Sequence, residues 1–143
     1  MELAFQEDYN LLNAPCPPLH YTSQNIEEVY RWTFETIEDT RNFKSQYHKN
    51  PKRFQLKSDK EKCSALALSM FNNLAGAKER FAEIAEDMGE KIYQIVGNKI
   101  AKGSISSECG LNGRIERHGH FNHHPAKGIP SQPTFQIFEN LIV

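Results

Sequence analysis

One amphipathic segment near the middle of the chain constrains the possible folds most strongly. From Leu74 to Met88, apolar residues recur every three or four positions and charged residues fill the positions between them, as expected for a helix with one buried face. Asn72 or Asn73 can cap its start, and Gly89 stands where a glycine ends a helix. The sequence therefore predicts a long helix over about residues 73–89 that packs on another layer.

The segments around this helix favour strands. Residues 64–71 are an almost wholly apolar run, too short for an independent helix and typical of a buried strand. Residues 91–96 and 134–143 are rich in β-branched and aromatic side chains. These patterns predict an α+β fold in which a mixed or antiparallel sheet packs with at least one long helix.

Residues 25–37 fit two patterns. Their apolar residues match a helical face, yet Tyr30 and Trp32 also alternate with Arg31 as they would in a strand. A helix would place Trp32, the only tryptophan, on its polar face. We therefore expect a strand over residues 29–34.

The length of 143 residues, 38% of them hydrophobic, predicts a single domain spanning residues 1–143. Within it we expect a partly irregular N-terminal segment (1–24), a basic loop-rich segment (41–62) and a loop rich in His, Pro and Gly (117–133). The acidic start of the chain does not resemble a secretory signal, and no apolar run is long enough to span a bilayer. The expected location is the cytoplasm, with no membrane partner.

The formal net charge of −1 conceals two oppositely charged blocks. Residues 1–40 hold eight acids and one base, a net charge of −7, whereas residues 41–62 hold eight bases and two acids, a net charge of +6. The basic block interleaves its cations with Phe43, Tyr47 and Phe54, a combination that can bind single-stranded nucleic acid but also describes a solvated loop. Either the acidic block folds over the basic block and pairs with it, or the basic block binds a partner, such as an acidic protein.

The three cysteines, Cys16, Cys63 and Cys109, form an odd set without a C-x-x-C pair. This pattern argues against a disulfide framework and against a structural zinc knuckle. We expect reduced thiols, with Cys63 in the core and the other two in loops. A weaker alternative pairs Cys109 with a histidine as a nucleophile.

Four of the six histidines fall within seven residues. If residues 114–120 are extended, His118 and His120 point to the same face, and a turn at Asn122 can bring His123 back towards them. Three imidazoles suffice for a catalytic zinc ion that keeps one position open. The candidate metal ligands are therefore His118, His120 and His123, although no cofactor is required by the sequence.

The string from His118 to His123 resembles the H-x-H-x-D-H metal motif of the metallo-β-lactamase-like hydrolases, with Asn122 in place of the aspartate. That family uses further His and Asp ligands downstream, whereas none of the 19 residues after His124 is His, Asp or Cys. We therefore assign no family. The alternative without a functional site is a surface turn whose imidazoles form hydrogen bonds to the backbone or to water.

Two functions from different classes remain. The first is a protein-interaction or accessory module without catalysis, which binds a protein partner or a second copy through the charged blocks, exposed aromatic residues or a C-terminal edge strand. The second is a small hydrolase or transferase that acts on a phosphate-containing substrate at residues 118–124. Its candidate residues are, for catalysis, His118, His120, His123, Glu116 and Arg117, and, for substrate binding, Arg114, Trp32, Tyr30 and Arg53.

Overall fold

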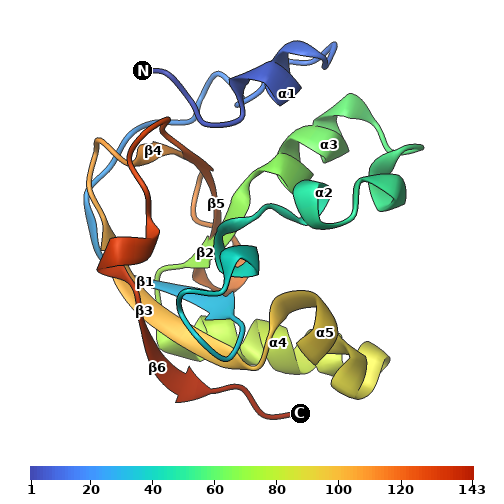
Figure 1. Ribbon diagram of the computed structural model, residues 1–143, viewed down its shortest axis with the longest axis vertical. Coiled ribbons are helices and arrows are strands. Elements are labelled where there is room, and N and C mark those ends of the chain that lie inside the picture. The colour runs from blue at the N-terminus through green and yellow to red at the C-terminus, as the bar shows by residue number, and fades with distance from the viewer.

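The computed structural model describes residues 1–143 and is built on a six-stranded sheet in the order β4-β5-β2-β1-β3-β6 (Figure 1). Every neighbouring pair is antiparallel. The predicted α+β class is therefore confirmed, and of the two sheet types expected the antiparallel one is present. The strands are β1 (Ile26–Thr33), β2 (Leu68–Phe71), β3 (Lys99–Ile105), β4 (Gly110–Asn112), β5 (His120–Pro125) and β6 (Gln136–Asn140).

The predicted long helix is α4, Leu74–Met88. The Asn73 side chain accepts a hydrogen bond from the Gly76 backbone N–H at 2.7 Å, and Gly89 ends the helix with a φ of 60°. Both caps predicted from the sequence are thus correct. Gly76 also lets α4 lie close to the backbone of the turn at His118, because a Cβ on residue 76 would lie 1.8 Å from the carbonyl oxygen of His118.

The remaining helices are short. Several of them fill the basic segment 41–62, and in Figure 1 α2 and α3 lie above α4 and α5, on the same side of the sheet. The α-helices are α1 (Gln6–Asn10), α2 (Gln46–Lys49), α3 (Asp59–Leu66) and α5 (Ile92–Val96), and the 3₁₀ turns are Thr40–Phe43, Pro51–Phe54, Gly89–Lys91, Arg117–Gly119 and Gln132–Thr134.

Two of the predicted strands are wrong in whole or in part. The first three residues of the run 64–71 belong to α3, a helix that begins upstream, where the Ser58 side chain caps it by accepting a hydrogen bond from the Glu61 N–H at 3.1 Å. Only the end of the run forms β2. The predicted strand over residues 91–96 is instead the last residue of a 3₁₀ turn, Lys91, followed by helix α5. Helical spacing there buries Ile92 against α4, and this packing outweighs the β propensity of the segment.

The ambiguous segment 25–37 contains β1, as the position of Trp32 indicated. Its indole packs against Phe71 and Phe81, and Nε1 donates a hydrogen bond to the Ala77 carbonyl at 3.1 Å. The prediction of a loop over 117–133 is wrong for its first half, since strand β5 occupies it. Pairing with β2 on one side and β4 on the other makes β5 an inner strand.

Two hydrophobic clusters hold the layers together. One is centred on the sheet, and the other joins α4 and α5 to strands β1, β2 and β3. The first cluster contains Val29, Leu68, Met70, Ala101, Ile105, Cys109, Phe121 and Phe135. The second contains Tyr30, Phe71, Ala77, Phe81, Ala85, Ile92, Ile100 and Leu141.

The N-terminal segment is tied to the rest of the chain by isolated bridges, Leu3 with Ala126 and Thr22 with Asn112, and by a disulfide. Cys16 and Cys63 are bonded, with their Cα atoms 5.7 Å apart. The expectation that all cysteines are reduced thiols is therefore wrong for this pair. Cys63 is buried on α3 as predicted, and Cys109 is a buried free thiol.

None of the helices combines the length and the apolar character that crossing a membrane requires.

Candidate functional site

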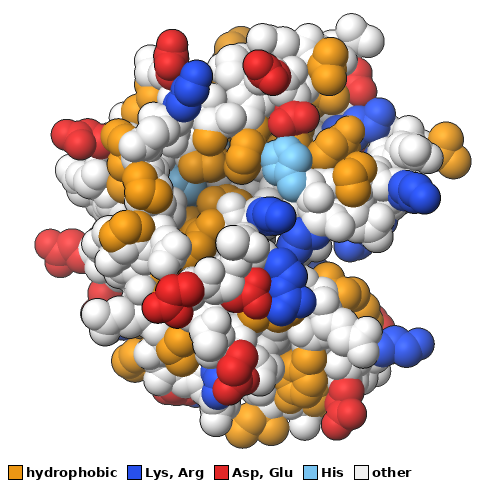
Figure 2. All heavy atoms as spheres, viewed as in Figure 1, with side chains coloured by type: hydrophobic (Ala, Val, Ile, Leu, Met, Phe, Trp, Pro, Cys, Tyr) orange, Lys and Arg blue, Asp and Glu red, His pale blue; other side chains and the backbone are white.

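A cleft of about 1390 Å³ separates the helices of the basic segment from α4 and α5. Figure 2 shows the surface hollowed between these two groups, with Lys and Arg side chains at the inner end of the hollow. Strands β1, β2 and β5 contribute residues to its floor, among them Ser69 and His120. The cleft thus collects residues from segments that are far apart in the sequence.

The charges that line the cleft have mostly one sign. Its lining contains one carboxylate, Glu61. Of its cations, Arg41 pairs with Asp39 at 2.7 Å and Arg80 with Glu83 at 3.5 Å, whereas the others form no ion pair. The seven cationic side chains are Arg31, Arg41, Lys44, Lys49, Arg53, Lys60 and Arg80.

Arg31 is the most deeply buried of these cations, with 6% of its surface exposed. Strands β1 and β2 are paired only at Tyr30 and Phe71, and the guanidinium bonds the backbone carbonyls near this short pairing. Nε donates to Asn42 at 2.7 Å and Nη1 to Ser69 at 2.7 Å. Burial lowers the pKa of Arg31 to about 10, so the residue is a desolvated charge without a counter-ion.

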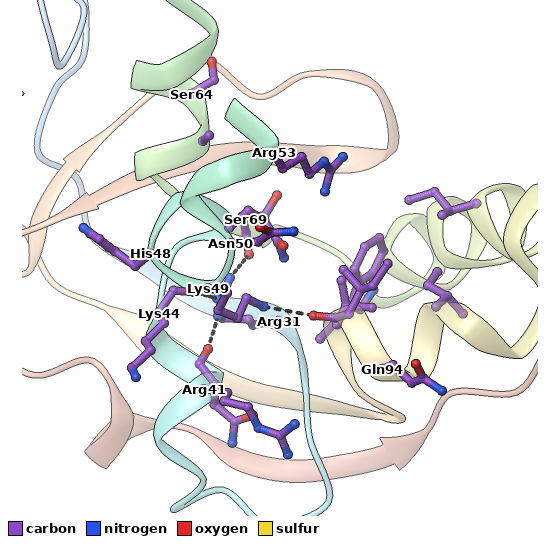
Figure 3. A pocket seen from close by; sticks show the side chains of 18 of the residues that line it. Arg31, Arg41, Lys44, His48, Lys49, Asn50, Arg53, Ser64, Ser69 and Gln94 are labelled. Atoms are coloured by element: carbon purple, nitrogen blue, oxygen red, sulfur yellow. Dashed lines mark hydrogen bonds between the residues drawn. The ribbon is translucent and has the colours of Figure 1, made fainter. Parts of the chain in front are cut away.

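Lys49 connects the two walls of the cleft. Its Nζ donates a hydrogen bond from α2 to the carbonyl oxygen of Ile95 on α5 at 3.0 Å, beside Arg31 (Figure 3). Burial and, to a smaller extent, the positive charges of Arg31 and Arg41 together lower its pKa to about 8. Lys49 is therefore a cation whose charge a bound anion would stabilise.

Ser69 and His120, at the floor of the cleft, form a hydrogen-bonded chain with an exposed carboxylate outside it. Nε2 of His120 bonds Ser69 Oγ, and its Nδ1 lies 3.3 Å from the Glu116 carboxylate. Burial lowers the pKa of His120, while Glu116 opposes that shift. A neutral imidazole held between a hydroxyl and a carboxylate is arranged to accept a proton from the hydroxyl.

The run of histidines does not act as one cluster. His118, in a turn with a φ of 66°, bonds Glu83 on α4 at 2.9 Å and does not line the cleft. His123 and His124 are fully buried, with hydrogen bonds to Asn112 and Tyr9 respectively. The ligand atoms of His118, His120 and His123 form no metal-binding group. His118 lies in the turn before β5, and His120 and His123 point to opposite faces of that strand.

Burial affects the last two histidines most. It lowers the pKa of His123 to about 3, with a smaller contribution from the charge of His124, and the pKa of His124 to about 4. Their Nε2 atoms make no hydrogen bond. Both imidazoles are therefore neutral parts of the interior.

The other predicted site residues are dispersed. Trp32 and Arg53 line the cleft, whereas Tyr30 is buried in the α4 cluster. Arg114 is exposed outside the cleft, and Arg117 pairs with Glu83 at 3.3 Å. The structure therefore brings only part of the predicted set together.

The most buried cation of the cleft was missed from the sequence. The strand alternation placed Arg31 on the polar face, so the residue gave no sign of burial. A lone arginine within an otherwise acidic block of 40 residues was the only available signal. Ser69 gave none, since it lies in an apolar run.

The two charged blocks meet at few points. Asp8 bonds His48 at 3.0 Å, and Asp39 bonds Arg41. The hydrogen bonds from Arg41 hold the pKa of Asp39 well below its usual range. The acidic block therefore leaves most of the cations that line the cleft without a partner.

Comparison of the chain with known protein families, with curated proteins and with solved structures gave no match.

Proposed function

We propose that the cleft binds a phosphate-containing ligand and that the protein is a small hydrolase or transferase acting on it. The observation that carries the proposal is that five of the seven cations lining the cleft have no carboxylate partner. Like charges held this close repel one another, and a bound phosphate relieves that repulsion while it accepts charge-assisted hydrogen bonds.

The uncharged part of the lining favours a nucleotide over a bare phosphate. The half-buried rings of Trp32 and Phe54 line the same cleft as Lys49 and Arg53. Aromatic rings stack on bases, and cations beside them neutralise phosphates. A ligand that carries both groups uses both parts of the cleft.

His120 supplies the chemistry in this proposal. Its Nε2 accepts a proton from the Ser69 hydroxyl or from a substrate hydroxyl that takes the same position, and Glu116 stabilises the imidazolium that results. Arg31 and Lys49 lie where they can stabilise the negative charge that develops on a phosphoryl group.

Calorimetric titration tests the binding step. Adenosine diphosphate and inorganic pyrophosphate are the probes, and Lys49→Gln and Arg53→Gln are compared with Arg114→Gln, whose cation is exposed outside the cleft. We expect each cleft variant to weaken binding about tenfold, since a hydrogen bond to a charged group contributes about 1.5 kcal/mol or more. Arg114→Gln should match the wild type.

Failure of the wild type to bind either probe would refute the proposal, as would an equal loss in Arg114→Gln. A single-stranded oligonucleotide is titrated in parallel. If it alone binds, and its affinity falls steeply with salt, the ligand is a nucleic acid held by the segment 41–62.

A second candidate is the interaction module, here as a homodimer. Strand β6 forms one edge of the sheet, and its side chains Ile137 and Phe138 are 38% and 47% exposed. An edge strand with exposed apolar residues can pair with the same strand of a second copy. Analytical ultracentrifugation of the wild type and of Phe138→Lys tests this, with a dimer that dissociates in the variant as the supporting outcome.

A further inference from the structure

Two sulfur atoms and an imidazole meet in the interior, outside the cleft. The Sγ atoms of Cys16 and Cys63 and a ring nitrogen of His124 all lie within 4.8 Å of one another. The three residues come from the N-terminal segment, α3 and β5. Their grouping is therefore a product of the tertiary structure.

His124 has one ring nitrogen in a hydrogen bond and one that is free. The side chain is fully buried, and its Nδ1 is held by the Tyr9 hydroxyl at 2.7 Å. Its Nε2 is buried as well and makes no hydrogen bond. A buried polar atom without a partner is costly and rare, so an unpartnered nitrogen on an imidazole that lies beside two sulfur atoms calls for a physical explanation.

We infer that Cys16, Cys63 and His124 form a zinc site once their disulfide is reduced. Two thiolates and one imidazole suit Zn²⁺, with a fourth, open position for water. Zinc lies about 2.3 Å from sulfur and about 2.0 Å from nitrogen, which places tetrahedral ligand atoms about 3.4–3.8 Å apart. The three donor atoms already lie within 4.8 Å of one another, so the main change needed is separation of the two bonded sulfurs.

The outer contacts of the site support this assignment. Metal-bound histidines commonly use their second ring nitrogen in a hydrogen bond that fixes the orientation of the ring. Tyr9 makes that bond to His124. Cys16 is only partly buried, so a reductant and a metal ion have a route to the sulfurs.

The reaction balances with a trialkylphosphine as reductant. The phosphine takes the oxygen of one water and becomes the phosphine oxide, while the disulfide accepts two electrons and two protons to give two thiols. Binding of Zn²⁺ then displaces the two thiol protons to solvent. The disulfide form and the zinc form are thus alternative states of the same three residues.

The first experiment compares oxidised and phosphine-reduced wild-type protein. Each is titrated with Zn²⁺ in competition with a chromophoric chelator and, separately, with Co²⁺. We expect one metal ion per reduced chain, thiolate-to-cobalt charge-transfer absorption and two thiols protected from alkylation. Equal zinc binding by the oxidised and reduced proteins, or no binding by either, overturns the inference.

Variants identify the ligands. His124→Asn should weaken binding by at least about 100-fold, more than loss of an outer partner typically costs, whereas His123→Asn changes an equally buried neighbour outside the group and should bind normally. Tyr9→Phe should weaken binding about tenfold. Cys109→Ser should have no effect, and loss of binding in that variant contradicts the assignment. If His124→Asn does not fold, Tyr9→Phe and the two wild-type states still decide the question.

Discussion

The histidines of strand β5 lie in two different environments, the cationic cleft and the buried interior. His120 lies at the floor of the cationic cleft between a serine and a glutamate, whereas His123 and His124 are fully buried. All three have lowered pKa values with burial as the main cause, but only His120 has a carboxylate that opposes the shift. The difference shows that the surroundings of each imidazole, rather than its position in the run, decide its chemistry.

The largest expected effect is a loss of stability at acidic pH, caused by the two fully buried histidines. The pKa values of His123 and His124 are lower in the folded protein than the ordinary 6.5. Their stabilisation is therefore complete above about pH 6.5 and is lost as pH falls towards 4 and 3, because the unfolded chain takes up protons that the folded chain refuses. Between pH 8 and pH 4.5 we expect a loss on the order of 5 kcal/mol in the free energy of unfolding.

Urea unfolding of the oxidised protein in chelator measures this loss. In His124→Gln the decrease over the same pH interval should shrink by about half, since one of the two titrating groups is gone. His120→Gln serves as the control and should keep most of the dependence. A free energy of unfolding that stays constant down to pH 4.5 would contradict the burial of these imidazoles as neutral groups.

Arg31 belongs both to the charged cleft and to the interior, because its side chain lines the cleft and is buried. Arg31→Met leaves the carbonyl oxygens of Asn42 and Ser69 without their donor. We expect a loss of about 3 kcal/mol in the free energy of unfolding at neutral pH, at the upper end for hydrogen bonds to a charged group. Arg41→Met, whose side chain is half exposed, should cost much less, and equal costs would argue against a buried guanidinium.

The role of His120 can be separated from that of the other histidines by turnover. If the protein hydrolyses a chromogenic phosphodiester, His120→Gln should lower kcat by about 100-fold or more, the usual contribution of general base catalysis. His118→Gln is the matched control, because that side chain bonds Glu83 outside the cleft. Equal losses in both variants would assign the chemistry elsewhere.

The smallest expected effect concerns Lys49 and pyrophosphate binding. Its pKa of about 8 means that the free protein loses this charge as pH rises above 8, whereas a bound anion holds the proton. Affinity should therefore fall by up to about tenfold between pH 8 and pH 9. Lys49→Arg, which stays charged throughout, should remove this decline, and a decline that persists in the variant would trace it to another group.

Much of the local structure follows from the sequence because its causes are local. The apolar spacing of α4 and its caps Asn73 and Gly89 lie within one stretch of chain. The alternation around Trp32 likewise marks β1. The errors at residues 64–66 and 91–96 arose where packing and a Ser58 cap outweighed β propensity.

The candidate site was predicted only in part. The sequence pointed to a basic segment and to His120, both of which contribute to the cleft, but it grouped His120 with neighbours that the structure places elsewhere. It could not find Arg31 or Ser69, because their importance depends on the meeting of β1 and β2. The cysteine pair lay 47 residues apart with no spacing that pointed to a bond.

By itself, then, the sequence determined the long helix, the strand around Trp32, the α+β class and the separation of positive from negative charge. These depend on periodicity and composition over short stretches. The tertiary structure decided which cations share a cleft, which histidine meets Ser69 and which sulfurs meet His124. Those outcomes depend on contacts between residues tens of positions apart, and such contacts exist only after the chain has packed.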